Sequence, residues 1–585
     1  MRLTDEQRGA VDEEGHVCLV SCPGSGKTRV IVAKLLRCID AVMGSTRRVA
    51  CITHTNAAAD EIDFRLRETC FGSEVDYYEI ATIHGFALQN ILRPFHPLLP
   101  EFIAGFSILT PDEDAYVDKA RELLTIYGID SVTTEEFERI QRTLDGVPFA
   151  VATLPLELQL DWCTWLDANA YVTLNEIVYH AGRLVNTYDH IASALASHFA
   201  WMLVDEFQDS SPGQIQILKR IHGFGRTTFF CVGDPNQSIY RFAGATPELL
   251  LEFAGDIGAI VNHRLTGNFR SSAHICALAD RLCPSVPPME AVGEHSACDI
   301  VPIHQIVESA AEGIFDIFLP VVRELELPLG RVAILAAWWG SLYHLARQLR
   351  QQGVPALGPG ARPYKRSHLV APLMESIGAH LACRDAETAI GVQRALFGLL
   401  ADLGDGAFRS VFAYRGRVVV CKLIAEAAAS KATCVHAAAW IIDVAAKLSE
   451  ILTAAEMLPA AYGRVLMESS GQMIADISSR EGGDQITVDD LGVFAQPRHC
   501  IQLLTVHRAK GREFDAVAVI EAHDGRFPHF SVERINDEEE REAQYDESRR
   551  VVYVATTRAK QVLMFFSDTS HYRNRPSPFL AEMGL

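Results

Sequence analysis

Residues 21–28, which read Ser-Cys-Pro-Gly-Ser-Gly-Lys-Thr, constrain the fold of this chain more than any other segment. They follow an apolar run at 16–21 and precede a segment with helical periodicity, Thr-Arg-Val-Ile-Val-Ala-Lys-Leu-Leu. A glycine-rich turn between a buried strand and a helix lets backbone N–H groups wrap phosphates. We therefore predict a P-loop, in which Lys27 reaches the β- and γ-phosphates of a nucleotide and Thr28 holds magnesium.

The whole loop contributes to the predicted nucleotide site. Ser21 stands where such loops usually begin with glycine or alanine, and its small side chain is a tolerable substitute. The predicted nucleotide-binding residues of the loop are Ser21, Cys22, Pro23, Gly24, Ser25, Gly26, Lys27, Thr28 and Arg29.

A pair of carboxylates lies far downstream, at the end of the apolar run in Trp-Met-Leu-Val-Asp-Glu-Phe-Gln-Asp (201–209). Ligands of open parallel sheets bind at the carboxyl ends of the strands. We predict that Asp205 holds magnesium together with Thr28, and that Glu206 orients and deprotonates the attacking water. An ordinary acidic strand end is the alternative, and it is disfavoured because the pair accompanies a P-loop.

Short apolar runs alternate with helical patterns in two separate regions of the chain. Strands that are apolar throughout are buried on both faces, which is typical of parallel sheets covered by helices. The sequence therefore predicts an α/β fold with two parallel-sheet domains, interrupted by mainly helical insertions near 91–190 and near 361–496. The apolar runs lie at 16–21, 48–53, 201–206 and 227–234 in the first region, and at 331–337, 516–522 and 561–566 in the second.

Charge and cysteine placement exclude several classes of protein. The formal net charge of −21 argues against coating nucleic acid by bulk electrostatics, so a DNA site must be a local basic or aromatic groove. The 14 cysteines are scattered without a Cys-x-x-Cys pair, which disfavours a zinc ribbon or an iron–sulfur cluster. The charged N-terminus and the shortness of every apolar run predict a cytoplasmic protein without a membrane segment.

Further motifs follow one another in a fixed order along the chain. Together with VDEFQDS (204–210) they resemble the motifs of the UvrD/Rep branch of superfamily 1 helicases, and the last two are the most diagnostic. These motifs are LTDEQRGAV (3–11), ITHTNAAADEI (52–62), ATIHGFA (81–87), VGDPNQSIYRFAGA (232–245), GNFRSS (267–272), LLTVHRAKGREFDAVAVI (503–520) and ESRRVVYVATTRAK (547–560).

The resemblance implies two RecA-like P-loop NTPase domains that bind ATP and Mg²⁺. Phosphoryl transfer needs the charge on the γ-phosphate neutralised, which arginines supply best. By resemblance Arg270 and Arg558 are these arginines and Gln237 senses the γ-phosphate. The resemblance also implies adenine reading by Gln7, stacking of Phe269 on adenine where the family often has tyrosine, and ribose binding by Glu513.

The same resemblance implies an ATP-dependent 3′-to-5′ helicase or translocase acting on single-stranded DNA and single-strand/duplex junctions. ATP would close a cleft between the two RecA-like domains and hydrolysis would reopen it, so that each cycle becomes a step. Structural hydrogen bonding is the alternative role for the two histidines among the implied DNA contacts. These contacts are Thr55, Asn56, Thr82, His84, Tyr240, Phe242, Thr505 and His507.

Three features depart from the family pattern or leave alternatives open. The motif at 232–245 lacks the usual arginine at Ala243, for which Arg241 is a candidate substitute. Trp338 and Trp339 could stack on bases, but they end an apolar run, so we expect them to be buried. A small basic cluster could touch duplex DNA or could equally be a solvated loop, and it comprises Arg362, Lys365 and Arg366.

The resemblance suggests a division into four parts. Domain 1A comprises 1–90 and 191–266 and is interrupted by 1B at 91–190. Domain 2A comprises 267–360 and 497–585 and is interrupted by 2B, a compact helical insertion, at 361–496.

Two other functions remain open at this stage. The chain could be a DNA-stimulated ATPase subunit that activates, or is regulated by, a partner nuclease in repair or anti-phage defence, because small UvrD-like proteins of this kind resemble the helicase components of Gabija-type systems. It could instead be a non-catalytic nucleotide-binding scaffold. The presence together of Lys27, Glu206, Gln237, Arg270 and Arg558 argues against the scaffold.

Overall fold

The computed structural model describes residues 2–69, 76–130, 132–149, 151, 153–241, 244–403, 411–434, 436–479, 485–569 and 575–585. These residues form two compact units. The first comprises Met1–Asp299 with Ser531–Thr557, and the second comprises Ile300–Phe530 with Arg558–Leu585. The four-part division into 1A, 1B, 2A and 2B stays a prediction.

A parallel six-stranded sheet forms the centre of the first unit, in the order β10-β1-β9-β8-β2-β3. Alternate residues of each strand enter different cores. In β1, Val17 and Leu19 pack with α2, whereas Cys18 packs with the helices of the opposite face. Both faces of the sheet are therefore buried at its centre, which is why the central strands β1, β8 and β9 are mainly apolar. The strands are β1 (Val17–Ser21), β2 (Arg48–Thr53), β3 (Tyr78–Thr82), β8 (Phe199–Val204), β9 (Thr228–Gly233) and β10 (Arg264–Leu265).

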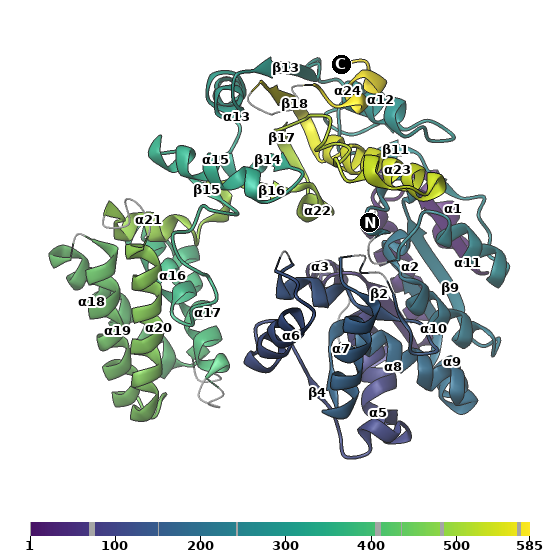
Figure 1. The fold of residues 1–585 in the computed structure, drawn as a ribbon, viewed down its shortest axis with the longest axis horizontal. Coiled ribbons are helices and arrows are strands. Elements are labelled where there is room, and N and C mark those ends of the chain that lie inside the picture. The colour runs from purple at the N-terminus through teal and green to yellow at the C-terminus, as the bar shows by residue number, and fades with distance from the viewer. Residues whose placement is uncertain are drawn as a thin grey trace. The chain divides into compact units, whose positions relative to one another are not determined.

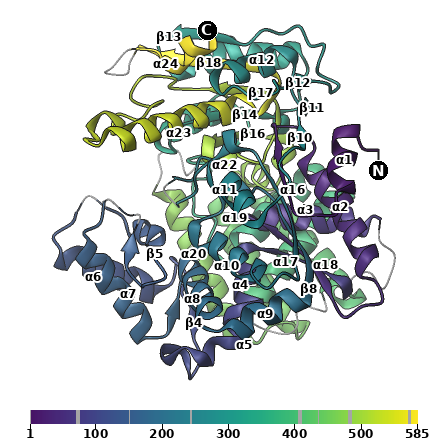
Figure 2. The same ribbon diagram turned by 90° about the vertical axis from the view of Figure 1, so that its right-hand side faces the viewer.

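Helices cover the two faces of this sheet in separate layers (Figures 1 and 2). Helices α2 (Lys27–Val42) and α3 (Asn56–Arg67) share one core, and α8 (Leu174–Thr187), α9 (Asp189–His198), α10 (Pro212–His222) and α11 (Leu249–Ile257) share the other. The unit also contains α1 (Asp5–Asp12), α12 (Ala273–Leu282) and α23 (Glu538–Thr556).

A small substructure of the first unit has its own core. Helices α6 (Asp114–Ile126) and α7 (Leu156–Ala168) pack around the buried Trp162, and the short strands β5 (Gln141–Arg142) and β6 (Pro148–Phe149) pair beside them. Figure 2 shows α6, α7 and β5 grouped next to α8, which β5 contacts. The helical interpretation of residues near 91–190 is thus consistent with the structure, in which the strands among the described residues of this segment are two residues long.

The second unit repeats the parallel arrangement with the strand order β13-β18-β17-β14-β16-β15. The prediction of an α/β fold with two parallel sheets is confirmed. The strands are β13 (Ile303–Val307), β14 (Val332–Ala336), β15 (Ala356–Leu357), β16 (Ile501–Thr505), β17 (Phe514–Val519) and β18 (Ala559–Asp568).

A helical bundle is inserted between β15 and β16 of the second unit. Helix α16 packs on α17 and α21, and α19 packs on α18 and α20 (green in Figure 1). The buried Trp440 of α19 donates its indole N–H to the carbonyl of Ala427 at 3.0 Å. The helices are α16 (Ala371–Cys383), α17 (Ala386–Asp402), α18 (Tyr414–Thr433), α19 (Ala437–Ala454), α20 (Gly463–Ser478) and α21 (Val488–Val493). No helix among the described residues is long and apolar enough to cross a membrane.

Two expectations about the second unit change. Trp338 and Trp339 are 43% and 55% exposed, so the expectation that they are buried is wrong. The reason is that β14 ends at Ala336, before the two tryptophans, which lie in the turn that leads into α15 (Gly340–Gln351). The guanidinium of Arg362 pairs with the buried Glu375 at 2.7 Å, which makes it a structural group and not a solvated charge.

Candidate active site

The P-loop and the acidic motif meet because their strands are close neighbours in one parallel sheet. Strand β9 lies between β1 and β8, with Val20 opposite Gly233 and Val204 opposite Cys231. The residues that follow these three strands therefore emerge at the same edge. The hydroxyl of Ser21 donates to the carbonyl of Gly233 at 3.1 Å, a contact that its small polar side chain makes possible.

Two glycines of the P-loop have backbone angles that other residues rarely adopt. Gly24 has φ +67° and Gly26 has φ +80°. A Cβ atom on Gly24 would lie 2.7 Å from the Cβ of Arg270, and one on Gly26 would lie 3.0 Å from the Nε2 of Gln7. The loop therefore needs glycine for its conformation and for the close approach of its neighbours.

Neighbouring segments fix the loop from two sides. The amide of the buried Gln7 donates to the carbonyl of Ser25 at 2.9 Å and accepts from the backbone N–H of Thr4 at 3.1 Å. The backbone N–H of Phe269 donates to the carbonyl of Gly24 at 2.9 Å. Gln7 thus ties α1 to the P-loop, and its reading of adenine stays a prediction.

The ammonium of Lys27 and the carboxylate of Glu206 form the central ion pair of the site, with Nζ and Oε2 3.0 Å apart. Burial disfavours the charged ammonium, but Glu206 and Asp234 outweigh that cost and hold the pKa of Lys27 above its ordinary value. Two residues that are 179 positions apart in sequence are thereby brought to one point.

Asp205 and Glu206 differ in exposure and in electrostatic environment. Asp205 is buried, and this burial together with the nearby charge of Glu206 raises its pKa to about 7. Glu206 is a non-glycine residue with φ +49° and ψ +43°, a left-handed conformation that costs energy. Its backbone N–H donates to the Oδ1 of Asp205 at 2.9 Å, so the turn at the end of β8 is held by the carboxylate beside it.

Gln208 and Asp234 belong to the site, although sequence reasoning gave them no role. The amide of Gln208 donates to the Oε2 of Glu206 at 2.6 Å and accepts from the backbone N–H of Asp234 at 2.9 Å. Asp234 in turn accepts from the amide of Gln237 at 2.6 Å. A chain of hydrogen bonds therefore connects Glu206 with Gln237. The sequence indicated this connection only in that the motifs at 201–209 and 232–245 follow adjacent strands.

Residues 268–271, which include Arg270, lie against the P-loop. The Oδ1 of the buried Asn268 accepts from the backbone N–H groups of Arg270 at 2.7 Å and of Ser271 at 2.8 Å. The guanidinium of Arg270 donates to the carbonyl of Thr557 at 3.1 Å. Sequence reasoning missed Asn268, whose side chain orients the turn that carries Arg270.

The donors of the loop fit a phosphate group. The hydroxyl of Ser25 is buried without a hydrogen-bond partner among the described residues, which is costly unless an acceptor is supplied. It lies in a loop with two left-handed glycines and precedes the half-buried Lys27 by two residues. Thr28 stands at the second position of α2, and Arg29 is exposed.

The remaining predicted nucleotide residues lie in the second unit. Arg558 is 1% exposed, and its guanidinium donates to the carbonyl of Arg512 at 3.1 Å. Glu513 is exposed and pairs with Lys560 at 2.8 Å. Arg558 therefore contacts the residue that precedes Glu513, so these two predicted nucleotide-binding residues are neighbours within the second unit.

The predicted DNA contacts of the first unit include two helix caps. The hydroxyl of Thr55 accepts from the N–H of Ala58 at 3.2 Å, and that of Thr82 accepts from the N–H of Gly85 at 3.1 Å. Strands β2 and β3 pair with Thr53 opposite Thr82, so both caps lie at one edge of the sheet. Asn56, at the start of α3, is exposed.

The aromatic and imidazole groups of this set are less exposed. Burial holds the pKa of His84 below its ordinary value, which favours the neutral ring. Burial raises the pKa of Tyr240 to about 12. Phe242 lies outside the described residues. The guanidinium of Arg241 pairs with Glu540 at 2.7 Å, so it already has an intramolecular partner.

Thr505 and His507 lie two positions apart in the sequence of the second unit. Thr505 ends β16 and precedes α22 (Val506–Ala509), which carries His507. Both side chains are half-buried. The roles of all these residues in DNA binding stay predictions.

Comparisons with known proteins agree with the motif order. The model of the UvrD/REP helicase N-terminal domain matches residues 3–147 and 158–258, and that of the UvrD-like helicase C-terminal domain matches 480–570. These ranges together cover more than half of the chain.

Several curated helicases are similar to this chain. ATP-dependent DNA helicase PcrA of Staphylococcus epidermidis is 23% identical over 99% of this chain and 86% of PcrA. Putative ATP-dependent DNA helicase YjcD of Bacillus subtilis is 24% identical over 96% of this chain and 78% of YjcD. ATP-dependent DNA helicase Rep of Escherichia coli is 28% identical over 49% of this chain, and the matched stretch spans only 44% of Rep.

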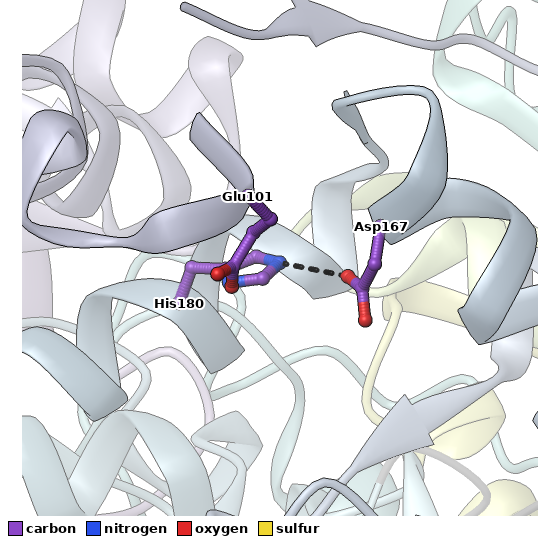
Figure 3. A group of neighbouring side chains, drawn as sticks. All are labelled: Glu101, Asp167 and His180. Atoms are coloured by element: carbon purple, nitrogen blue, oxygen red, sulfur yellow. Dashed lines mark ion pairs between the residues drawn. The ribbon is translucent and has the colours of Figure 1, made fainter. Parts of the chain in front are cut away.

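A second cluster of ionisable groups lies where the small substructure joins α8. Glu101, Asp167 and His180 each offer a ligand atom within 4.8 Å of the other two (Figure 3). Two guanidinium groups enter the same cluster. Arg142 pairs with Asp167 at 2.7 Å and with Glu176, and Arg183 pairs with Glu101.

These pairs make the cluster an ion-pair network and not a cation site. Burial works against the charge of Arg142, but hydrogen bonds to Asp167 and Glu176 hold its pKa above the ordinary value. A metal ion would be repelled by the two guanidinium groups, which already bind the carboxylates of Asp167 and Glu101. Asp167 belongs to α7 and Glu176 to α8, so Arg142 links the small core to the main one.

We expect Arg142→Leu to lower the free energy of unfolding by roughly 3–5 kcal/mol, because it leaves the buried carboxylate of Glu176 without its guanidinium partner. Urea unfolding followed by tryptophan fluorescence measures this change, since Trp162 and Trp165 lie in the small core. Arg139→Leu removes an arginine that is half-exposed beside Glu136, and it should cost less than about 1 kcal/mol. Equal stability of the two variants, or a rise in melting temperature on adding Zn²⁺ to the wild type, would contradict the ion-pair assignment.

Proposed function

Because the chain belongs to the UvrD-like helicase family, we propose that it hydrolyses ATP and uses hydrolysis to move 3′-to-5′ along single-stranded DNA. The observation that carries the proposal is the ion pair between Lys27 and Glu206, with its hydrogen-bonded extension through Gln208 to Asp234 and Gln237. The groups proposed to bind phosphate and to activate water are thus connected by an ion pair and hydrogen bonds.

The ion pair supports a specific division of labour. Phosphate oxygens compete with Glu206 for the ammonium of Lys27, because both are anionic. When the ammonium turns to the β- and γ-phosphates, Glu206 keeps its hydrogen bond from Gln208 and stays in place. Its carboxylate then accepts the proton of the attacking water as the γ-phosphoryl group is transferred to that water.

The other groups of the site complete the chemistry. Thr28 and Asp205 would hold Mg²⁺, which supplies charge neutralisation for the β- and γ-phosphates. Arg270 and Arg558 neutralise the charge that develops on the γ-phosphoryl group. Gln237, hydrogen-bonded to Asp234, reports the presence of the γ-phosphate to the rest of the chain.

Residues at the carboxyl ends of the strands, including threonines that cap helices, hold the DNA. Thr55 follows β2 and Thr82 ends the neighbouring β3 in the first unit, and Thr505 ends β16 in the second. Contacts of this kind are made to the backbone and to base faces, which makes binding independent of sequence. A net charge of −21 requires such local contacts, since the protein as a whole repels DNA.

We expect Glu206→Gln to retain ATP binding and to abolish hydrolysis. The amide cannot accept the proton of water, and its loss of charge removes a competitor for Lys27. ATP binding by a fluorescent analogue and phosphate release with oligo-dT measure the two steps. Glu252→Gln, which alters an exposed carboxylate of α11, is the control and should hydrolyse ATP normally. Near-normal turnover by Glu206→Gln would reject this residue as the base.

Arg270→Ala and Arg558→Ala should each lower DNA-stimulated turnover by about 10³-fold, the scale of arginines that stabilise phosphoryl transfer. ATP affinity should fall much less, because the two groups act mainly on charge that develops in the transition state. Arg264→Ala removes an exposed arginine from β10 and should leave turnover unchanged. Rapid hydrolysis by both test variants would exclude the proposed arginine pair.

The direction of movement has its own test. On oligonucleotides that carry biotin–streptavidin at one end, the protein should displace streptavidin from the 5′ end when ATP is added. The 3′-end block is the matched control. Faster displacement from the 3′ end would show the opposite polarity and leave the ATPase assignment intact.

A further inference from the structure

Three aromatic side chains of the second unit are exposed next to one another at the end of β14. Trp338, Trp339 and Tyr343 are 43%, 55% and 40% exposed. The ring centroids of Trp338 and Trp339 are 5.5 Å apart, and those of Trp339 and Tyr343 are 5.2 Å apart. We call these three residues the aromatic cluster. Exposed aromatic surface of this size is costly in water unless it binds something.

Two glycines give the rings the space they occupy. A Cβ atom on Gly340 would lie 2.3 Å from the indole of Trp338, and one on Gly360 would lie 2.5 Å from the ring of Tyr343. These rings therefore lie against backbone, where any larger residue would displace them. The cluster is built into the turn and is not formed by side chains that project freely into solvent.

An ion pair between Arg526 and Glu521 lies next to the aromatic cluster. The guanidinium of Arg526 lies 5.3 Å from the ring centroid of Trp338 and pairs with Glu521 at 3.1 Å. Glu521 also accepts from the hydroxyl of Ser341 at 2.6 Å, next to the start of α15. Cation–π contact and this hydrogen bond fix the orientation of Trp338. Trp339, the most exposed of the three, is then held against fixed neighbours.

The position of the cluster indicates its ligand. Strands β14 and β16 pair with Ala336 opposite Thr505, so the turn that carries the cluster emerges beside the turn that carries His507. Helix α22 contacts β14, and α15 contacts β16. The exposed Arg508 of α22 adds a positive charge at this edge. Aromatic rings, a cation and hydroxyl groups at one sheet edge are the combination that binds single strands.

We propose that the aromatic cluster is a base-stacking platform for single-stranded DNA, with Trp339 as the ring that contacts a base. This inference rests on the proposed function, and it extends the DNA contacts of the second unit beyond Thr505 and His507. Stacking on a ring makes no use of base identity, which suits a protein that moves along a strand. The strand backbone passes Arg508, whose guanidinium contacts a phosphate.

The test compares the affinity of Trp339→Ala, Trp339→Phe and the wild type for oligo-dT, measured by fluorescence anisotropy of a labelled strand. Loss of one stacking ring should weaken binding by about 5- to 150-fold, and the phenyl ring of Trp339→Phe should restore most of it. The DNA concentration for half-maximal ATPase stimulation should rise by the same factor in Trp339→Ala, while the rate at saturating DNA is kept. Tyr414→Ala, which removes an 84% exposed ring from α18, is the control and should bind like the wild type.

Each outcome distinguishes the platform from the function on which it rests. If the wild type neither binds oligo-dT nor is stimulated by it, the proposed function fails. If the wild type binds and Trp339→Ala binds equally well with an unchanged melting temperature, the platform is wrong and the function stands. A lower melting temperature of Trp339→Ala with equal loss in Trp339→Phe would make the ring a packing residue and overturn the proposal.

Discussion

Parallel pairing of β1, β9 and β8 is the constraint on which the first unit depends. Alternate side chains of these strands enter cores on opposite faces, so a shift of one residue would exchange the two sets. The register that results brings the turn after β1 and the turn after β8 to either side of Gly233. Lys27 and Glu206 meet because burial fixes the strands, not because the ion pair pulls them together.

Uncharged residues determine how closely the groups at this sheet edge can approach one another. Gly233 is one example, since a Cβ there would lie 2.8 Å from the Oε1 of Gln208. Without that side chain the amide of Gln208 can bridge Glu206 and Asp234. The carboxylate of Glu206, the proposed base, is in this way oriented by a neutral neighbour, and its conformation at φ +49° is maintained by contacts on both sides.

The sequence identified the groups that carry charge but not those that orient them. Lys27 and Glu206 follow from the order of strand, glycine-rich loop and downstream acidic pair, which is the pattern expected of a nucleotide site in a parallel sheet. Gln208 and Asn268 act through hydrogen-bond geometry between turns that are distant in sequence, and a linear pattern does not contain that geometry. The exposure of Trp338 and Trp339 was missed for a related reason, since hydropathy alone does not reveal that β14 ends at Ala336.

The helical bundle α16–α21 leaves the second sheet after β15 and returns at β16, and these two strands are paired neighbours with Leu357 opposite Gln502. The two ends of the inserted segment are therefore close together in space, at the edge of the sheet. A segment anchored in this way can gain or lose residues at little cost in chain entropy, since loop closure depends only weakly on length. The length of this segment can thus change while the order of the strands in the sheet stays the same.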